Sequence, residues 1–183
     1  MLDKYLIEHC SPTLASLKSA NLFSVNYHND KELEEQVERW NRQLTAKGVT
    51  LMVLHRQPGT ALIYVCRKRR LQQDWQKPGA ARFLAGYGYA VTDVEDALNR
   101  LKIRLAESET FPHEIGLFLG YPLKDVVGFI HNAGKNCKCA GCWKVYGDEC
   151  EAVKIFSKFK KCRDVYKRHW EQGKSVWQLT VSA

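Results

Sequence analysis

Three cysteines lie within six residues of one another, in the spacing C-x-C-x-x-C at Cys137, Cys139 and Cys142. Thiolates this close together can share a zinc ion or an iron–sulfur cluster, and two thiols separated by two residues can form a redox disulfide. A metal would need a fourth ligand, for which the candidates are Cys150, His131 and Cys10. The alternative is that these cysteines are reduced, partly exposed thiols, whose flanking lysines would favour the thiolate form.

A second candidate for chemistry is the adjacent pair His113 and Glu114. An imidazole beside a carboxylate could transfer protons or bind a metal ion. Neighbouring residues on a strand point to opposite faces, however, so the two side chains need not meet. The alternative is an ordinary surface pair.

The elements expected around these residues run from 111 to 146. Residues 115–120 alternate Ile or Leu with Gly or Phe, which predicts a buried strand. Tyr121 and Pro122 then form a turn into a helix over 124–131, whose first amides would favour an anion. A basic loop carrying the three cysteines follows, and a second strand ends near residue 146.

Elsewhere, local signals predict further elements. Asn29 followed by Glu32 predicts a helix start, and the stretch 92–95 predicts another. The runs 49–55 and 60–66 predict a hairpin with a type II turn at Gln57-Pro58-Gly59-Thr60. A short helix over 2–9 should end at Ser11-Pro12, the longest helix should begin near 148, and 176–181 should be a closing strand. These elements predict an α+β fold with one mixed sheet of about six strands, including the hairpin, and about six helices.

Composition and length favour a single domain over residues 1–183. Apolar residues make up 45% of the chain and charged residues 26%, an ordinary balance for a folded domain. No apolar run is long enough for a membrane span, and the first residues lack the features of a secretory signal. Seven cysteines, an odd number, argue against a disulfide framework. We therefore expect a soluble cytoplasmic protein with reduced thiols and no membrane partner.

The chain is basic, with a formal net charge of +8 that is concentrated in residues 56–82 and 135–174. Such an uneven distribution favours an anionic partner. The alternative is a set of solvated helix faces.

Several stretches together resemble one bacterial family, the domain-of-unknown-function family 3793, found chiefly in anaerobes. The resemblance covers nearly the whole chain and is carried by HCSPTLASLKSANLF (9–23), LIYVCRKRRL (62–71), FPHEIGLFLGYPLKDVVGFI (111–130), GKNCKCAGCWKVY (134–146) and the segment that begins AVKIFSKFKKCRDVYKRHW. The family brings no established activity or cofactor. The resemblance also implies a connection with iron uptake and flavodoxin, hence with iron or redox physiology.

The resemblance implies which positions form the family signature, and several of them are polar. If these side chains converge, Cys10 would be a nucleophile with His9 or His113 as its base, and Glu114 would assist. The implied ligand-binding residues are His9, Thr13, Lys18, Arg67, Tyr121, Lys135 and Lys144. Such a site would suit a small anionic metabolite or cofactor.

Three functions follow from these observations. The first is a domain that binds, and could act on, a small anionic molecule at the polar signature residues. The second is a metal- or redox-linked accessory protein, with a redox partner, that uses Cys137, Cys139 and Cys142. The third is nucleic-acid binding through the basic stretches, which no recognised motif supports. The sequence identifies neither a cofactor nor a reaction.

Overall fold

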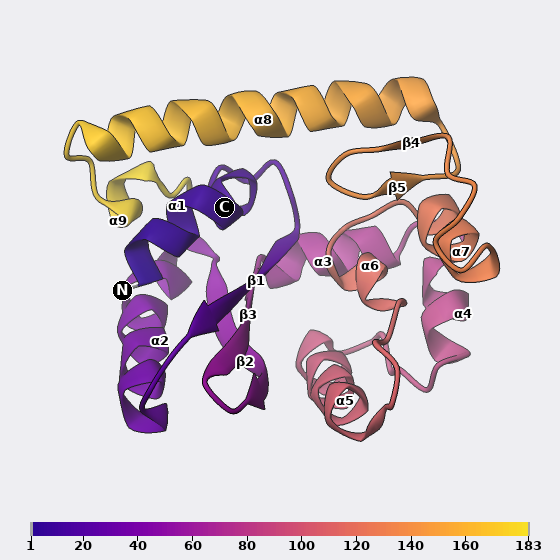
Figure 1. Ribbon diagram of the computed structural model, residues 1–183, viewed down its shortest axis with the longest axis horizontal. Helices are drawn as coiled ribbons and strands as arrows, with labels where there is room; N and C mark the ends of the chain where they lie inside the picture. The colour runs from indigo at the N-terminus through magenta and orange to yellow at the C-terminus, as the bar shows by residue number, and fades with distance from the viewer. Residues whose placement is uncertain (1, 183) are drawn as a thin grey trace. The chain divides into compact units, whose positions relative to one another are not determined.

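The computed structural model describes residues 2–182, which form two compact units (Figure 1). The first, here called the sheet unit, consists of the described residues up to Leu71 and those from Cys162 onward. The second, here called the central unit, is Gln72–Lys161. The long helix α8 (Glu149–Glu171) contributes its first part to the central unit and its last part to the sheet unit.

The sheet unit is built on a three-stranded antiparallel sheet in the order β1-β3-β2. Its strands are β1 (Ala20–Asn26), β2 (Thr50–Gln57) and β3 (Thr60–Cys66). The expected hairpin is confirmed: Gln57 pairs with Thr60, and Gly59 has the positive φ of +77° that the turn requires. The remaining elements of this unit are α1 (Leu2–Leu14), α2 (Asp30–Leu44), the 3-10 turn η1 (Thr45–Lys47) and α9 (Val176–Leu179).

Helix α2 begins where the sequence predicts. The side chain of Asn29 accepts hydrogen bonds from the backbone N–H groups of Lys31 and Glu32, which have no partner within the helix. The residues of α2 that recur at helical spacing are buried in the core of the sheet unit: Leu33, Val37, Trp40 and Leu44. Burial of this stripe holds the helix against the sheet.

Helix α1 differs from its prediction, because it continues through Pro12 to Leu14 instead of ending near residue 9. Proline removes one backbone donor, whose acceptor would have been the carbonyl of the exposed residue Glu8. Cys10 and Leu14 are fully buried on the same face as the earlier apolar residues of the helix. Burying this last turn outweighs the one hydrogen bond that Pro12 cannot make.

The central unit contains mostly short helices. They are the end of α3 (Lys68–Trp75), α4 (Ala80–Ala85), α5 (Val94–Glu107), α6 (Ile115–Phe118), α7 (Leu123–His131) and the beginning of α8. Two short strands, β4 (Cys139–Ala140) and β5 (Lys144–Val145), pair as an antiparallel hairpin. Helix α5 starts at Asp93, whose side chain caps its first turn.

Two predicted strands are wrong. Residues 115–120 form α6 and the turn after it, and residues 176–181 contain α9. In the first case Ile115 to Leu119 are all buried, so the run is apolar throughout and its apparent alternation carries no information about strand or helix. In the second, Ser175 and Gln178 form a capping box that starts a helix.

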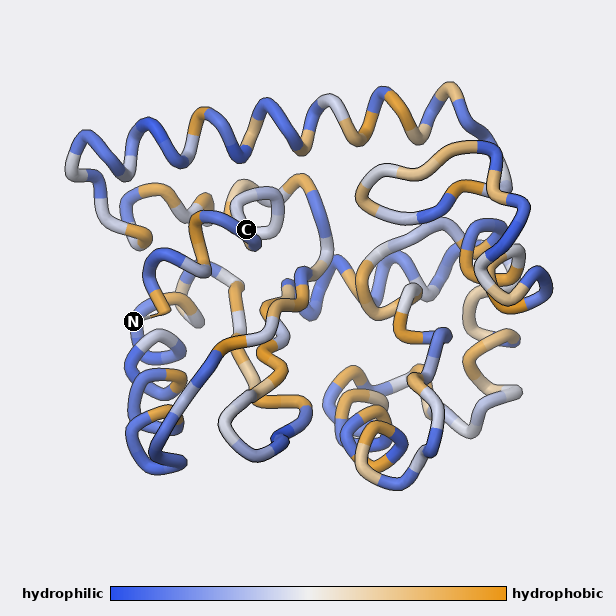
Figure 2. The backbone as a smooth tube through the Cα atoms, viewed as in Figure 1, coloured by the Kyte–Doolittle hydropathy of each residue, from blue (hydrophilic) through white to orange (hydrophobic). Residues whose placement is uncertain are grey.

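The α+β class is therefore confirmed, while its details change. Residues 2–182 contain nine α-helices and five strands, and the strands form two antiparallel sheets instead of one mixed sheet of about six. Hydrophobic positions are interspersed with hydrophilic ones along α8 (Figure 2). Within residues 2–182 no helix has the length and apolar character needed to cross a membrane.

Candidate functional site

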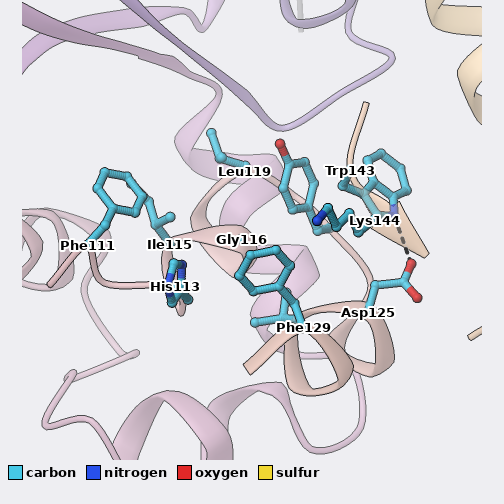
Figure 3. Close-up of a pocket in the computed structure, with 11 residues that line it drawn as sticks. Phe111, His113, Ile115, Gly116, Leu119, Asp125, Phe129, Trp143 and Lys144 are labelled. Atoms are coloured by element: carbon cyan, nitrogen blue, oxygen red, sulfur yellow. Dashed lines mark hydrogen bonds between the residues drawn. The ribbon is translucent and has the colours of Figure 1, made fainter. Parts of the chain in front are cut away.

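A pocket of about 310 Å³ lies in the central unit, among α6, α7 and the β4–β5 hairpin. Figure 3 shows Phe111 and Ile115 at one end of it, Trp143 and Asp125 at the other, and Phe129 and Lys144 between them. Its lining residues are Phe111, His113, Ile115, Gly116, Leu119, Tyr121, Asp125, Val126, Phe129, Trp143 and Lys144. Three residues of the predicted site, His113, Tyr121 and Lys144, therefore share one pocket.

The close approach of α6 to α7 shapes this pocket. A Cβ atom at Gly116 would lie 2.7 Å from Cγ2 of Val126 and 3.1 Å from Cδ2 of Tyr121, so only glycine fits there. Between the helices Gly120 has a φ of +76°, and the Tyr121 amide bonds back to the carbonyl of Gly116. The Gly-Tyr-Pro turn thus brings Tyr121 into the pocket wall.

Asp125 is the acidic residue among those lining the pocket, and its carboxylate is fully engaged by the protein. Oδ1 accepts the backbone N–H groups of Tyr146 and Gly147, each at 2.8 Å, while Oδ2 accepts the indole N–H of Trp143 at 2.7 Å. The side chain is buried. Asp125 therefore fastens the chain after β5 to α7, and both of its oxygens are occupied by donors of the protein.

Aromatic rings form much of the pocket wall. Tyr121 stacks on Trp143 with 4.8 Å between ring centroids, and His113 packs against Phe129 at 4.9 Å. Burial raises the pKa of Tyr121 to about 12, with a smaller contribution from the Cys142 thiol. Tyr121 therefore remains a neutral phenol.

Two side chains give the pocket available N–H donors. Lys144 donates from Nζ to the carbonyl of Gly134 at 2.6 Å, and the same atom lies 5.8 Å from the ring centroid of Phe129. Within residues 2–182 Gly134 is its one hydrogen-bond partner, so two of its three N–H donors are available. His113 makes ring contacts and, in the same part of the chain, no hydrogen bond.

Glu114 serves a different purpose from its neighbour His113. It is buried and accepts hydrogen bonds at Oε1 from the hydroxyl of Tyr89, at 2.9 Å, and from Nε of Arg104, at 2.5 Å. Burial and this hydrogen bond raise the pKa of Tyr89. Glu114 thus ties α5 to the start of α6, and its carboxylate is bonded to Tyr89 and Arg104 instead of His113.

Five residues of the predicted site belong to the sheet unit, and one of them, Arg67, bonds to the backbone. Its buried guanidinium donates to four backbone carbonyls, those of Thr13, Leu14, Lys47 and Val181, at 2.7 to 2.9 Å. Thr13 and Leu14 end α1, where carbonyls lack helical partners. Arg67 therefore joins the end of α1 to the carbonyls of Lys47 and Val181, and it adds a second hydrogen bond to the carbonyls of Thr13 and Leu14, which also accept backbone N–H groups.

The other four residues are also packed within the sheet unit. Lys18 is buried and donates to the carbonyl of Ala20, while the Thr13 hydroxyl donates to Oδ1 of Asn21. Cys10 is fully buried, and this burial raises its pKa, which disfavours the reactive thiolate. His9 is exposed, and its ring stacks with neighbouring aromatic rings.

The cysteine cluster lies on and beside the β4–β5 hairpin. Cys137, Cys139 and Cys142 are all half-buried, and residues 2–182 contain no grouping of three or more Cys, His, Asp or Glu side chains placed to hold a metal ion. Burial and the nearby Glu149 raise the pKa of Cys139, opposite to the effect expected from its flanking lysines. A metal or redox role for this cluster stays a prediction. Lys135 is exposed in the preceding loop.

Several pocket residues were absent from the predicted site. Phe111 and Phe129 were missed because isolated aromatic residues give no sequence signal that separates a pocket wall from a core. Trp143 and Asp125 lie in the stretches that carry the family resemblance but were not assigned to the site. The spacing of these two residues from the turn at Tyr121 could have indicated that they meet. Using that spacing requires knowing that residues 115–118 are helical.

Residues 6–180 match the family model described as protein of unknown function (DUF3793). The chain belongs to this family, as its sequence resemblance indicated. No curated protein and no solved structure shows significant similarity to the chain.

Proposed function

We propose that the central unit binds a small anionic molecule in the pocket between α6, α7 and the β4–β5 hairpin. The observation that carries this proposal is the combination of two side chains with available N–H donors, Lys144 and His113, and a carboxylate, Asp125, whose oxygens already accept three hydrogen bonds from the protein. A pocket with this lining attracts a negative charge and buries an apolar body.

The available donors of Lys144 support this proposal. An ammonium group forms charge-assisted hydrogen bonds with anionic oxygens, and the contact with Gly134 fixes its position without neutralising its charge. The Nζ atom lies 5.8 Å from the ring centroid of Phe129 and the His113 ring lies 4.9 Å from it, so the pocket offers a donor on each of two residues that contact this ring.

The arrangement favours binding over catalysis. A general base is normally oriented by a second polar group, and within residues 2–182 His113 has no hydrogen-bond partner that would do so. Glu114, the nearest carboxylate in sequence, is held by Arg104 and Tyr89. We therefore propose a binding function for this pocket and assign it no reaction.

The test uses 1-anilinonaphthalene-8-sulfonate, an aromatic anion whose fluorescence rises on binding, beside the uncharged N-phenyl-1-naphthylamine. We expect the sulfonate to bind and Lys144→Met to weaken it about threefold, the scale of a partly exposed charge pair. Binding of the uncharged compound should change little.

Lys138→Met is the matched control. Like Lys144, Lys138 is exposed and belongs to the region of the β4–β5 hairpin. It also donates from Nζ to a backbone carbonyl, that of Gly147, at 2.7 Å. Unlike Lys144, it does not line the pocket. Equal losses in the two variants, or no saturable binding of the sulfonate, would contradict the proposal.

A further inference from the structure

We infer that the ligand of this pocket is a planar aromatic monocarboxylate. The inference rests on the proposed function and narrows it to one class of molecule. It depends on the types of side chain that line the pocket and on the position of its two donor-bearing residues.

The walls favour a flat ring. Five of the eleven lining residues carry rings: Phe111, His113, Tyr121, Phe129 and Trp143. They form two groups, with Tyr121 stacked on Trp143 and His113 in contact with both Phe129, at 4.9 Å, and Phe111, at 6.1 Å. Aromatic rings have negative faces and positive edges, so they attract another ring in stacked or edge-to-face contact more than a saturated body of equal area.

The lining also limits the polar groups that a ligand can carry. It includes no Ser, Thr, Asn, Gln or Arg among the described residues of the pocket, and its acidic residue, Asp125, is already engaged in three hydrogen bonds. A sugar or a nucleoside would leave its hydroxyl groups without partners in such a pocket. The ligand must therefore be largely apolar outside its charged group.

The two donor-bearing residues define that charged group. Lys144 Nζ is 5.8 Å from the Phe129 ring centroid, and the His113 ring is 4.9 Å from the same point. Lys144 is the one Lys or Arg among the described lining residues, which matches a single negative charge, and its two available N–H donors match the two oxygens of one carboxylate. A phosphate fits this lining less well, because its described residues include no arginine, and the amides of Ile115 and Gly116 at the start of α6 already donate to the carbonyls of Pro112 and His113.

The experiment compares three compounds of one carbon framework by calorimetry on the full chain: 2-naphthoate, the uncharged planar 2-naphthamide, and the saturated anion decahydro-2-naphthoate. We expect 2-naphthoate to bind at least about threefold more tightly than either, which is the scale of one ring contact or one partly exposed charge pair.

Two variants connect this preference to the pocket. Lys144→Met should remove the preference for naphthoate over naphthamide, and Phe129→Leu should reduce the preference for naphthoate over its saturated analogue. Their controls are Lys138→Met and Phe83→Leu; Phe83 lies in α4 outside the pocket lining, where it contacts Tyr87. Both controls should leave the two preferences unchanged.

The outcomes separate the inference from the proposed function. If the saturated anion binds as tightly as naphthoate and Lys144→Met weakens both, the pocket takes anions but the aromatic class is wrong. If the anilinonaphthalene sulfonate binds in a Lys144-dependent way and naphthoate does not bind, the carboxylate class is wrong. If no anion depends on Lys144, the proposed function fails as well.

Discussion

Trp143 donates its indole N–H to Oδ2 of Asp125 at 2.7 Å, and both side chains are buried. This single contact joins a ring of the pocket wall to helix α7. The same carboxylate accepts two backbone N–H groups just after β5, so one side chain determines how the hairpin is attached.

Replacing Asp125 with asparagine should destabilise the central unit by about 1–3 kcal/mol. The amide keeps the size of the side chain but exchanges one acceptor oxygen for a donor, so at least one of three buried N–H groups loses its partner. Chemical denaturation followed by tryptophan fluorescence measures the effect. Asp96→Asn, on the exposed first turn of α5, is the control and should change stability by less than about 0.5 kcal/mol. Equal stability of the two variants would show that Asp125 is not an anchor.

Gly128→Ala in α7 tests the contact between this helix and Tyr146. In an exposed helix the change would gain about 1 kcal/mol of helix propensity. Here the new Cβ would lie 2.4 Å from both Cβ and Cγ of Tyr146, which sit too close to the backbone to move aside. We therefore expect a net loss of about 1–2 kcal/mol in the free energy of unfolding. Val127→Ala, on the exposed side of the same helix, is the comparison; a more stable Gly128→Ala protein would contradict the packing described.

Arg67→Lys should destabilise the sheet unit although the charge is kept. Lysine has three donors and lacks the planar fork of the guanidinium, so at least one of the four hydrogen bonds is lost, and we expect a cost of about 1–3 kcal/mol. Thermal unfolding measures the loss. Arg69→Lys, at an exposed position of α3, should be neutral. If Arg67→Lys weakened binding to DNA or RNA without changing stability, Arg67 would instead belong to the nucleic-acid function considered from the sequence.

Stability should fall at alkaline pH because of buried thiols in the sheet unit. Burial raises the pKa of Cys66 from 9.0 to about 12, so the folded protein keeps a proton that the unfolded chain releases. The stabilisation from this group is complete below pH 9 and is lost as pH rises through 12, by up to about 1.4 kcal/mol per pH unit. Cys66→Ala should make the fall between pH 9 and pH 11 shallower, whereas Cys150→Ala, at an exposed thiol, should not. Identical pH profiles of melting temperature would contradict this assignment.

The parts of the fold that the sequence predicts correctly are those with a local cause. The cap at Asn29 and the turn at Gly59 depend on residues only a few positions apart. The strand predicted over 115–120 failed because its residues are buried on all sides, which removes the periodicity that separates strand from helix. Helix α1 passes through Pro12 because of contacts with distant parts of the chain, which no local rule contains.

The candidate site shows the same division. His113, Tyr121 and Lys144 were named from signature positions and do line one pocket. The distinction between polar residues that face the pocket and those that serve the fold, such as Arg67 and Glu114, depends on hydrogen-bond partners distant in sequence. Those partners become visible only when the chain is folded.

The guanidinium of Arg67 also has a consequence for how the nascent chain matures on the ribosome. It binds carbonyls of Thr13 and Val181, and the Val181 amide in turn donates to the carbonyl of Leu14. All of Gln72–Lys161 is therefore translated before the last of these contacts can form. The sheet unit, although part of it precedes the central unit in the chain, is the later of the two to be completed.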